Sequence, residues 1–102
     1  MITDLQKYYN YWQLTVDFPD LPQKPRVSII AGEGQYSHPR QLCESFKDYS
    51  DYEFAFLLNG NLVHSTVTGY VPAEMLWSTI VDRLNSFGIT VPKESPINSY
   101  IY

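Results

Sequence analysis

The chain has one cysteine and no long run of apolar residues. Cys43 is the only cysteine among 102 residues, so an internal disulfide is excluded and a reducing compartment is expected. The N-terminal segment lacks the apolar core of a signal peptide. No segment approaches the roughly 20 apolar residues that a transmembrane helix requires. We therefore expect a cytoplasmic protein, either of a cell or of an infected host.

Positive charge is also scarce. Seven Lys and Arg face eleven Asp and Glu, which gives a formal net charge of −4, and the nearest approach to a basic cluster is Lys24 with Arg26. Nucleic acids and anionic membranes are bound by clustered cations. Neither is therefore expected as a direct partner.

Motifs for catalysis, metal binding and cofactor binding are lacking as well. His38, His64 and Cys43 do not have the paired spacing of a zinc motif. The segment from Gly32 follows the order strand, glycine turn and helix of a dinucleotide-binding turn, but Ser37 stands where the third glycine is needed. We expect no metal, no cofactor and no enzymatic activity.

The chain does contain enough apolar residues for one core. Hydrophobic residues make up 44% of the sequence and charged residues 18%, which is typical of a globular domain and not of disorder. At this length a single domain over residues 1–102 is expected. The elements predicted below indicate an α+β fold, in which helices pack against a small sheet.

Apolar spacing and proline positions predict three helices and one isolated strand. Apolar and aromatic residues from Leu5 to Trp12 recur at helical spacing, and Pro39 and Pro72 each suit the first turn of a further helix. A short apolar run that ends at glycine is typical of a buried strand. The predicted helices lie near 4–14, 39–49 and 72–87, and the strand lies at 27–31.

A β-hairpin is the strongest local prediction. Asn59-Gly60 is the preferred pair for a type I′ turn, and it separates two alternating segments, 52–58 and 62–68. The turn places Leu58 opposite Asn61, Phe56 opposite Val63, Phe54 opposite Ser65 and Tyr52 opposite Val67. The apolar face then carries Tyr52, Phe54, Phe56, Leu58, Val63 and Val67. The other face carries Glu53, Ala55, Leu57, Leu62, His64, Thr66 and Thr68.

Tyrosine is unusually abundant, with nine residues in the chain. Tyrosine buries a wide ring at low entropic cost and is enriched where proteins contact one another. Core packing accounts for Tyr9, Tyr49 and Tyr52, which fall on predicted apolar stripes. Tyr8 lies on the same predicted helical stripe as Tyr9. The five tyrosines with no predicted packing role are Tyr11, Tyr36, Tyr70, Tyr100 and Tyr102.

These features predict a small acidic module that binds another protein. Four carboxylates lie within residues 44–53, and tyrosines lie among them; tyrosine anchors with an acidic rim would suit a basic protein or a nucleic-acid enzyme. Such a module would neutralise its partner, as an inhibitor, antitoxin or immunity protein does. The candidate contact residues are Tyr49, Asp48, Asp51, Tyr52, Glu44, Glu53, Tyr11, Tyr36 and Tyr70.

The alternative hypothesis is a non-catalytic structural subunit or homodimer. The predicted register makes Leu57 and Leu62 cross-strand partners on the outer face of the hairpin. Together with the C-terminal segment 97–102, they would form a surface for self-association. A helix of the same chain could also cover this face.

Overall fold

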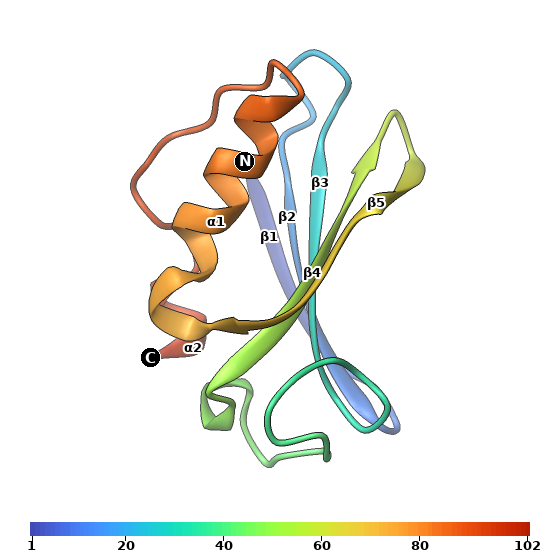
Figure 1. The fold of residues 1–102 in the computed structure, drawn as a ribbon, viewed down its shortest axis with the longest axis vertical. Coiled ribbons are helices and arrows are strands. Elements are labelled where there is room, and N and C mark those ends of the chain that lie inside the picture. The colour runs from blue at the N-terminus through green and yellow to red at the C-terminus, as the bar shows by residue number, and fades with distance from the viewer.

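The computed structural model describes residues 1–102 and contains one antiparallel sheet whose five strands lie in chain order (Figure 1). A helix, α1 (Ala73–Ser86), follows the last strand, and a one-turn helix, α2 (Asn98–Ile101), lies at the C-terminus. The α+β class predicted from the sequence is confirmed. The strands are β1 (Ile2–Lys7), β2 (Tyr11–Asp17), β3 (Arg26–Gly32), β4 (Asp51–Leu58) and β5 (Asn61–Pro72).

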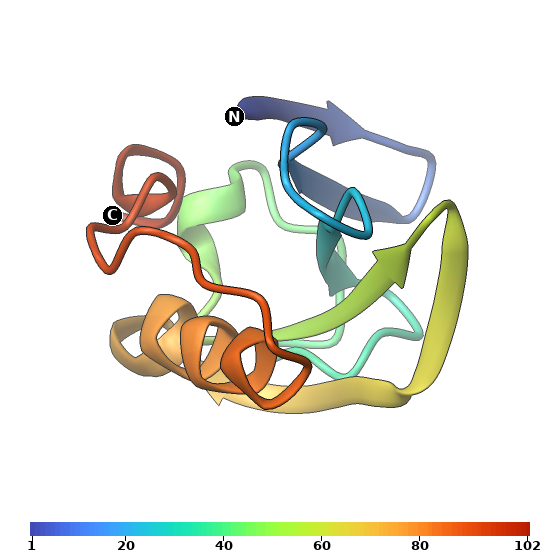
Figure 2. The same ribbon diagram turned by 90° about the horizontal axis from the view of Figure 1, so that it is seen from above.

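The sheet and the helical segments form two layers. Helix α1 and the C-terminal tail both lie on one side of the sheet, which we call its inner side (Figure 1 and Figure 2). Here the inward residues of β2, β3 and β4 meet the apolar stripe of α1 in one core cluster. Tail residues Ile89, Val91, Ile97 and Ile101 close this cluster and are almost fully buried.

The helix predicted over 4–14 is wrong, because this segment forms the β1–β2 hairpin. The register pairs Ile2 with Asp17 and Lys7 with Trp12, and the backbone N–H of Tyr8 donates to the carbonyl of Tyr11 at the turn. The helical spacing was a coincidence of the aromatic residues. The true signal is the alternation of Trp12, Leu14, Val16 and Phe18, whose side chains turn towards the core.

The helix predicted over 39–49 is also wrong. This segment is an irregular loop with one 3-10 turn, η1 (Phe46–Asp48), capped by Ser45. Side chains from elsewhere satisfy the backbone: the Trp12 indole N–H donates to the carbonyl of Cys43, and the Tyr49 hydroxyl donates to the carbonyl of Gln41. These hydrogen bonds replace those that a helix would supply.

The predicted third helix and the strand at 27–31 are confirmed. Helix α1 buries Leu76, Trp77, Ile80, Val81 and Leu84 along one stripe, as the spacing requires. Gly88 follows it with a φ of 77°, the left-handed conformation that ends many helices. Strand β3 pairs antiparallel with both β2 and β4.

The hairpin turn at Asn59-Gly60 is confirmed, but its predicted register holds only near the turn. Both turn residues have positive φ, as a type I′ turn requires, and Leu58–Asn61 and Phe56–Val63 pair as expected. Further along, Phe54 pairs with Thr68 and Tyr52 pairs with Val71, in place of the predicted Ser65 and Val67.

Two irregularities in β5 cause this shift of register, one between the partners of Phe56 and Phe54, where Thr66 lies, and one between the partners of Phe54 and Tyr52. The buried Thr66 hydroxyl accepts a hydrogen bond from the backbone N–H of Phe56 at 2.9 Å and donates to the carbonyl of Val63 at 2.7 Å. The Thr66 side chain thus makes a hydrogen bond to β4 that the backbone of β5 would make in a regular ladder. The additional residues of β5 between Val63 and Thr68 form the bulge. As a result Val67 is exposed and does not join the core face predicted for it.

Candidate protein-binding face

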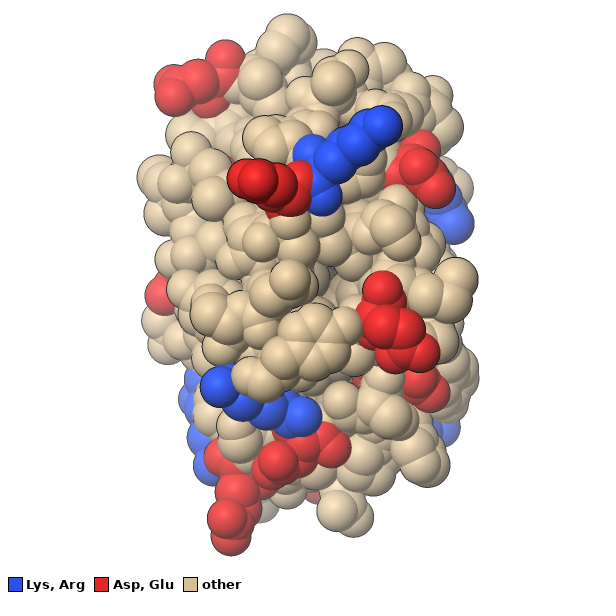
Figure 3. All heavy atoms as spheres, turned by 90° about the vertical axis from the view of Figure 1, so that its left-hand side faces the viewer, with Lys and Arg blue, Asp and Glu red and all other residues tan.

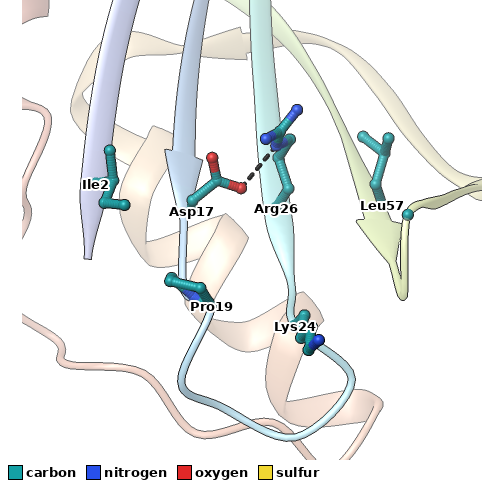
Figure 4. Close-up of a pocket in the computed structure, with 7 residues that line it drawn as sticks. Ile2, Asp17, Pro19, Lys24, Arg26 and Leu57 are labelled. Carbon is teal, nitrogen blue, oxygen red and sulfur yellow. Dashed lines mark hydrogen bonds and ion pairs between the residues drawn. The ribbon is translucent and has the colours of Figure 1, made fainter.

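The outer side of the sheet, which faces away from α1, is not covered by any helix or strand of the chain. Figure 4 shows Asp17, Arg26 and Leu57 standing on this side, with the helix behind the sheet. The strand registers align its side chains in rows that cross the sheet. The rows are Ile2–Asp17–Arg26–Leu57–Leu62, then Asp4–Thr15–Ser28–Ala55, then Gln6–Gln13–Ile30–Glu53, with Tyr11 beyond them on β2.

Apolar side chains form a diagonal stripe across these rows. The stripe begins at the directly paired Leu57 and Leu62 near the β4–β5 turn and ends at Tyr11 on the opposite side. It borders a shallow hollow of about 470 Å³, and Leu62 and Val67 are 43% and 41% exposed. The members of the stripe are Tyr11, Ile30, Ala55, Leu57, Leu62 and Val67.

Polar side chains occupy the β1–β2 side of the stripe and are partly paired. The Gln13 amide N–H donates to the Ser28 hydroxyl at 2.9 Å, and the Arg26 guanidinium Nε donates to the Asp17 carboxylate at 2.6 Å. Asp17 raises the pKa of Arg26 through this hydrogen bond. The Arg26–Asp17 pair borders a second hollow of about 440 Å³ at the end of the sheet, close to Lys24 (Figure 4).

The outer face carries a net negative charge. Its strand residues include three carboxylates, Asp4, Asp17 and Glu53, and one cation, Arg26. Three negative charges and one positive charge leave −2, half of the formal charge of the chain. The electrostatic potential on this side of the molecule is therefore negative.

Two tyrosine pairs lie at the Tyr11 end of the face. The rings of Tyr8 and Tyr11 stack with centroids 4.8 Å apart, and those of Tyr36 and Tyr70 lie 5.9 Å apart. The backbone N–H of Tyr36 donates to the Glu53 carboxylate at 2.8 Å, and Tyr11 and Glu53 border the same hollow. The structure thus places three of the candidate contact residues predicted from the sequence, Tyr11, Tyr36 and Tyr70, close to Glu53.

Two other candidates, Tyr49 and Tyr52, are core residues and are not surface anchors. Their exposed fractions are 3% and 0%, in agreement with their predicted packing role; the same prediction is wrong for Tyr9, which is 97% exposed in the turn between β1 and β2. The Tyr52 hydroxyl donates to the carbonyl of Phe46, and the Tyr49 hydroxyl accepts from the backbone N–H of Cys43. Burial raises the pKa of Tyr49 to about 12 and also raises the pKa of Tyr52. The expected rim of acidic residues around these two rings therefore does not form.

The acidic segment 44–53 does not act as one patch. Glu44 and Asp48 lie on the loop before β4, and Asp48 accepts a hydrogen bond from the backbone N–H of Ser45 in the η1 cap. Asp51 is the first residue of β4, and Glu53 lies on the outer face. On the side of the molecule that carries α1 and the tail, carboxylates and cations are interspersed among wide uncharged areas (Figure 3).

The C-terminal segment lies on the inner side and does not join the outer face of the hairpin. Ile97 and Ile101 are buried in the core, and the Tyr100 hydroxyl lies 3.0 Å from the Thr3 hydroxyl, within hydrogen-bonding distance. Only Tyr102 of this segment presents an exposed ring. The expectation that Leu57, Leu62 and the tail share one surface is therefore wrong, although the two leucines do form the expected cross-strand pair on the outer face.

The residues that could serve as catalytic groups or metal ligands, the cysteine and the two histidines, do not form a site. Cys43 is unpaired and half-buried in the loop before β4, His38 lies in the same loop with its backbone bonded to β4, and His64 is exposed on β5. No group of three His, Cys, Asp or Glu side chains comes together. The turn after Gly32 leads into a loop and not into a helix, so it lacks the helix N-terminus of a dinucleotide site.

Sequence reasoning missed the part of the outer face that lies on β1 to β3. Its residues alternate with the core residues of the same strands, so the assignment of β1 and β2 to a helix concealed them.

Neither α1 nor α2 has the length and apolar composition that a membrane-crossing helix requires. No protein-family model, curated protein or solved structure matches this chain.

Proposed function

We propose that the protein is a non-catalytic module that binds and neutralises a basic protein through the outer face of its sheet. The observation that carries this proposal is the apolar stripe on a sheet face that no element of the chain covers. An antiparallel sheet with one face in water normally carries polar residues there. Leucine, isoleucine, valine and tyrosine side chains on such a face are typical of a surface that another protein covers.

The tyrosines at one end of the stripe support the same conclusion. Tyr36 and Tyr70 are each 49% exposed, and the neighbouring backbone holds both in place: Tyr70 donates its N–H to the carbonyl of Tyr36. Rigid aromatic side chains lose little conformational entropy when they bind, so they often dominate the binding energy of an interface. They are suitable anchors beside the apolar stripe.

The charge of the face supports a basic partner. Asp4, Asp17 and Glu53 outnumber the single guanidinium of Arg26. Opposite charge accelerates association, and added salt slows it. The unpaired Cys43 is compatible with action in a reducing compartment such as the cytoplasm of a cell or of an infected host.

The experiment that tests this proposal compares two exposed positions on opposite sides of the molecule. The partner would be captured from cells that make the protein, identified by mass spectrometry and purified. Its affinity would then be measured for the wild type, Leu62→Lys and Met75→Lys, since Leu62 and Met75 are both exposed. Leu62→Lys should weaken binding at least about tenfold, while Met75→Lys on α1 should change it little. Equal binding by both variants would refute the proposed site.

The second candidate function is self-association through the same face. The observation in its favour is the Leu57–Leu62 pair on the outer face, in which Leu62 is exposed and Leu57 half-buried; a second copy could cover this pair. Light scattering over a range of concentrations distinguishes the two, because a dimer formed through this face would dissociate in Leu62→Lys and persist in Met75→Lys. A monomer at all concentrations would exclude this candidate.

A further inference from the structure

We infer that the segment recognised by the outer face is an amphipathic α-helix whose apolar stripe is flanked by Lys or Arg. This inference rests on the proposed function and specifies the partner of that same face. It follows from three properties of the face: the absence of free backbone groups, the shape of the apolar stripe, and the position of the carboxylates on both sides of it.

The backbone of the sheet determines which kind of segment can bind. In the three central strands, β2, β3 and β4, the backbone groups pair with neighbouring strands in the plane of the sheet. The outer face of these strands therefore presents side chains only. An extended peptide lying on this face would leave its own backbone groups without partners under the interface, which is costly. A helix satisfies its backbone internally and needs only side-chain contacts.

The length and relief of the stripe fit a helix. From Leu62 on β5 to Tyr11 on β2 the stripe crosses three strand spacings and three two-residue steps, or about 25 Å. This length corresponds to about 17 helical residues. The short side chains of Ser28 and Ala55, which are cross-strand partners, lie between longer side chains and leave the hollow in the middle of the stripe. A large apolar side chain on the helix could fill that hollow.

The charges specify what flanks the apolar side of the helix. Glu53 lies on one side of the diagonal, and Asp4 and Asp17 lie on the other. Lys or Arg on both borders of the apolar stripe would complement these carboxylates. A second copy of this chain is disfavoured as the occupant, since it would bring two faces of charge −2 into contact.

The test uses three synthetic peptides of about 18 residues, long enough to cover the stripe. The first is a Leu/Lys peptide designed as a basic amphipathic helix, the second has the same composition in scrambled order, and the third carries Glu in place of every Lys. Binding to the isotope-labelled full chain would be followed by NMR, which locates the perturbed amides, and by circular dichroism of the peptide.

The basic amphipathic peptide should bind at least about tenfold more tightly than either control peptide and become helical on binding. The perturbed amides should lie on β2 to β5 and include those of Ile30, Ala55 and Leu62. Leu62→Lys should reduce the affinity at least about tenfold, and Met75→Lys should not. Ala55→Leu, which fills the hollow without changing the charge, should also weaken binding.

Equal binding by the scrambled peptide, perturbation confined to α1 or the tail, or no saturable binding would overturn the helix inference. The proposed function would survive these outcomes if a natural partner still lost affinity for Leu62→Lys, because that partner would then present a folded surface of another kind. Ala55 is almost buried, so the exposed Leu62 provides the decisive variant if Ala55→Leu does not fold.

Discussion

Gly69 on β5 packs directly against the base of the Tyr36 side chain, which belongs to the loop between β3 and β4. A Cβ atom added at Gly69 would lie 2.5 Å from the Cβ of Tyr36, closer than any van der Waals contact permits. The contact is closed by the hydrogen bond from the Tyr70 N–H to the Tyr36 carbonyl at 2.8 Å. This pair fixes the two exposed rings of Tyr36 and Tyr70 beside each other.

We expect Gly69→Ala to destabilise the fold by about 1–3 kcal/mol, because the new methyl group must displace Tyr36. A double-mutant cycle measured by urea denaturation checks the cause. The cost should persist in a Tyr36→Ala background, which retains the Cβ, and should fall in a Tyr36→Gly background, which removes it. The same cost in both backgrounds would show that the steric contact is not responsible.

Thr66→Val should destabilise the protein by about 1–3 kcal/mol, because it leaves the N–H of Phe56 and the carbonyl of Val63 without their buried partner. Thr66→Ser retains the hydroxyl and should recover most of the loss. Both free energies of unfolding are measured with urea. If Thr66→Val leaves the stability unchanged while Thr66→Ser lowers it, the methyl packing of Thr66 matters and its hydrogen bonds do not.

The stability of the fold should decline in alkali. Burial raises the pKa of Tyr49 to about 12 and raises the pKa of Tyr52 as well, whereas an unfolded tyrosine titrates near about 10. Above this pH the unfolded chain loses these protons more readily than the folded chain, so the free energy of unfolding falls as the pH rises. The stability that these two protonated hydroxyls contribute is fully present below about pH 10 and is lost as the pH rises through their folded-state pKa values.

Tyr49→Phe and Tyr52→Phe check this expectation. Each variant should lower stability at neutral pH by about 0.5–1.5 kcal/mol through the loss of a hydrogen bond, and each should flatten the decline of stability above about pH 10. Tyr9→Phe is the matched control, since that ring is 97% exposed. If the free energy of unfolding declined with pH as steeply in both core variants as in the wild type, Tyr49 and Tyr52 would not be the cause of the alkaline decline.

Arg26→Gln should leave stability within about 1 kcal/mol of the wild type, because the Arg26 side chain of the Arg26–Asp17 pair is 51% exposed to solvent. Unlike most substitutions in an interface, it should raise the binding affinity. Removing the one cation among the strand residues of the outer face should strengthen binding of the basic amphipathic peptide, most clearly at low salt. Calorimetric titration at two salt concentrations measures this, and weaker binding would indicate that Arg26 contacts the ligand directly.

The parts of the fold that could be predicted from the sequence are those governed by local chemistry. The Asn59-Gly60 turn, the stripe of α1 and the apolar strand β3 each carry their signal within a short segment. The β1–β2 hairpin was missed because its aromatic residues imitate helical spacing. The loop before β4 was missed because its stabilising partners, Trp12 among them, lie far away in the sequence.

The candidate site could be predicted only in part for the same reason. The tyrosine excess drew attention to Tyr11, Tyr36 and Tyr70, and alternation placed Glu53, Leu57 and Leu62 on the outer face of the hairpin. Only the complete strand order shows that these residues belong to one surface. Conversely, Tyr49 and Tyr52 carry two signals in the sequence, since they fall on predicted apolar stripes and also lie among carboxylates; the structure buries both.

The bulge at Thr66 also has a consequence for how copies of the protein behave at high concentration. A regular strand at the border of a sheet is a template on which another chain can add a strand, and this is a common route to aggregation. In β5 the ladder is interrupted between Val63 and Thr68, so its free border does not present an even row of donors and acceptors. The same irregularity that brings Val67 to the surface thus makes this border a poor template for fibril growth.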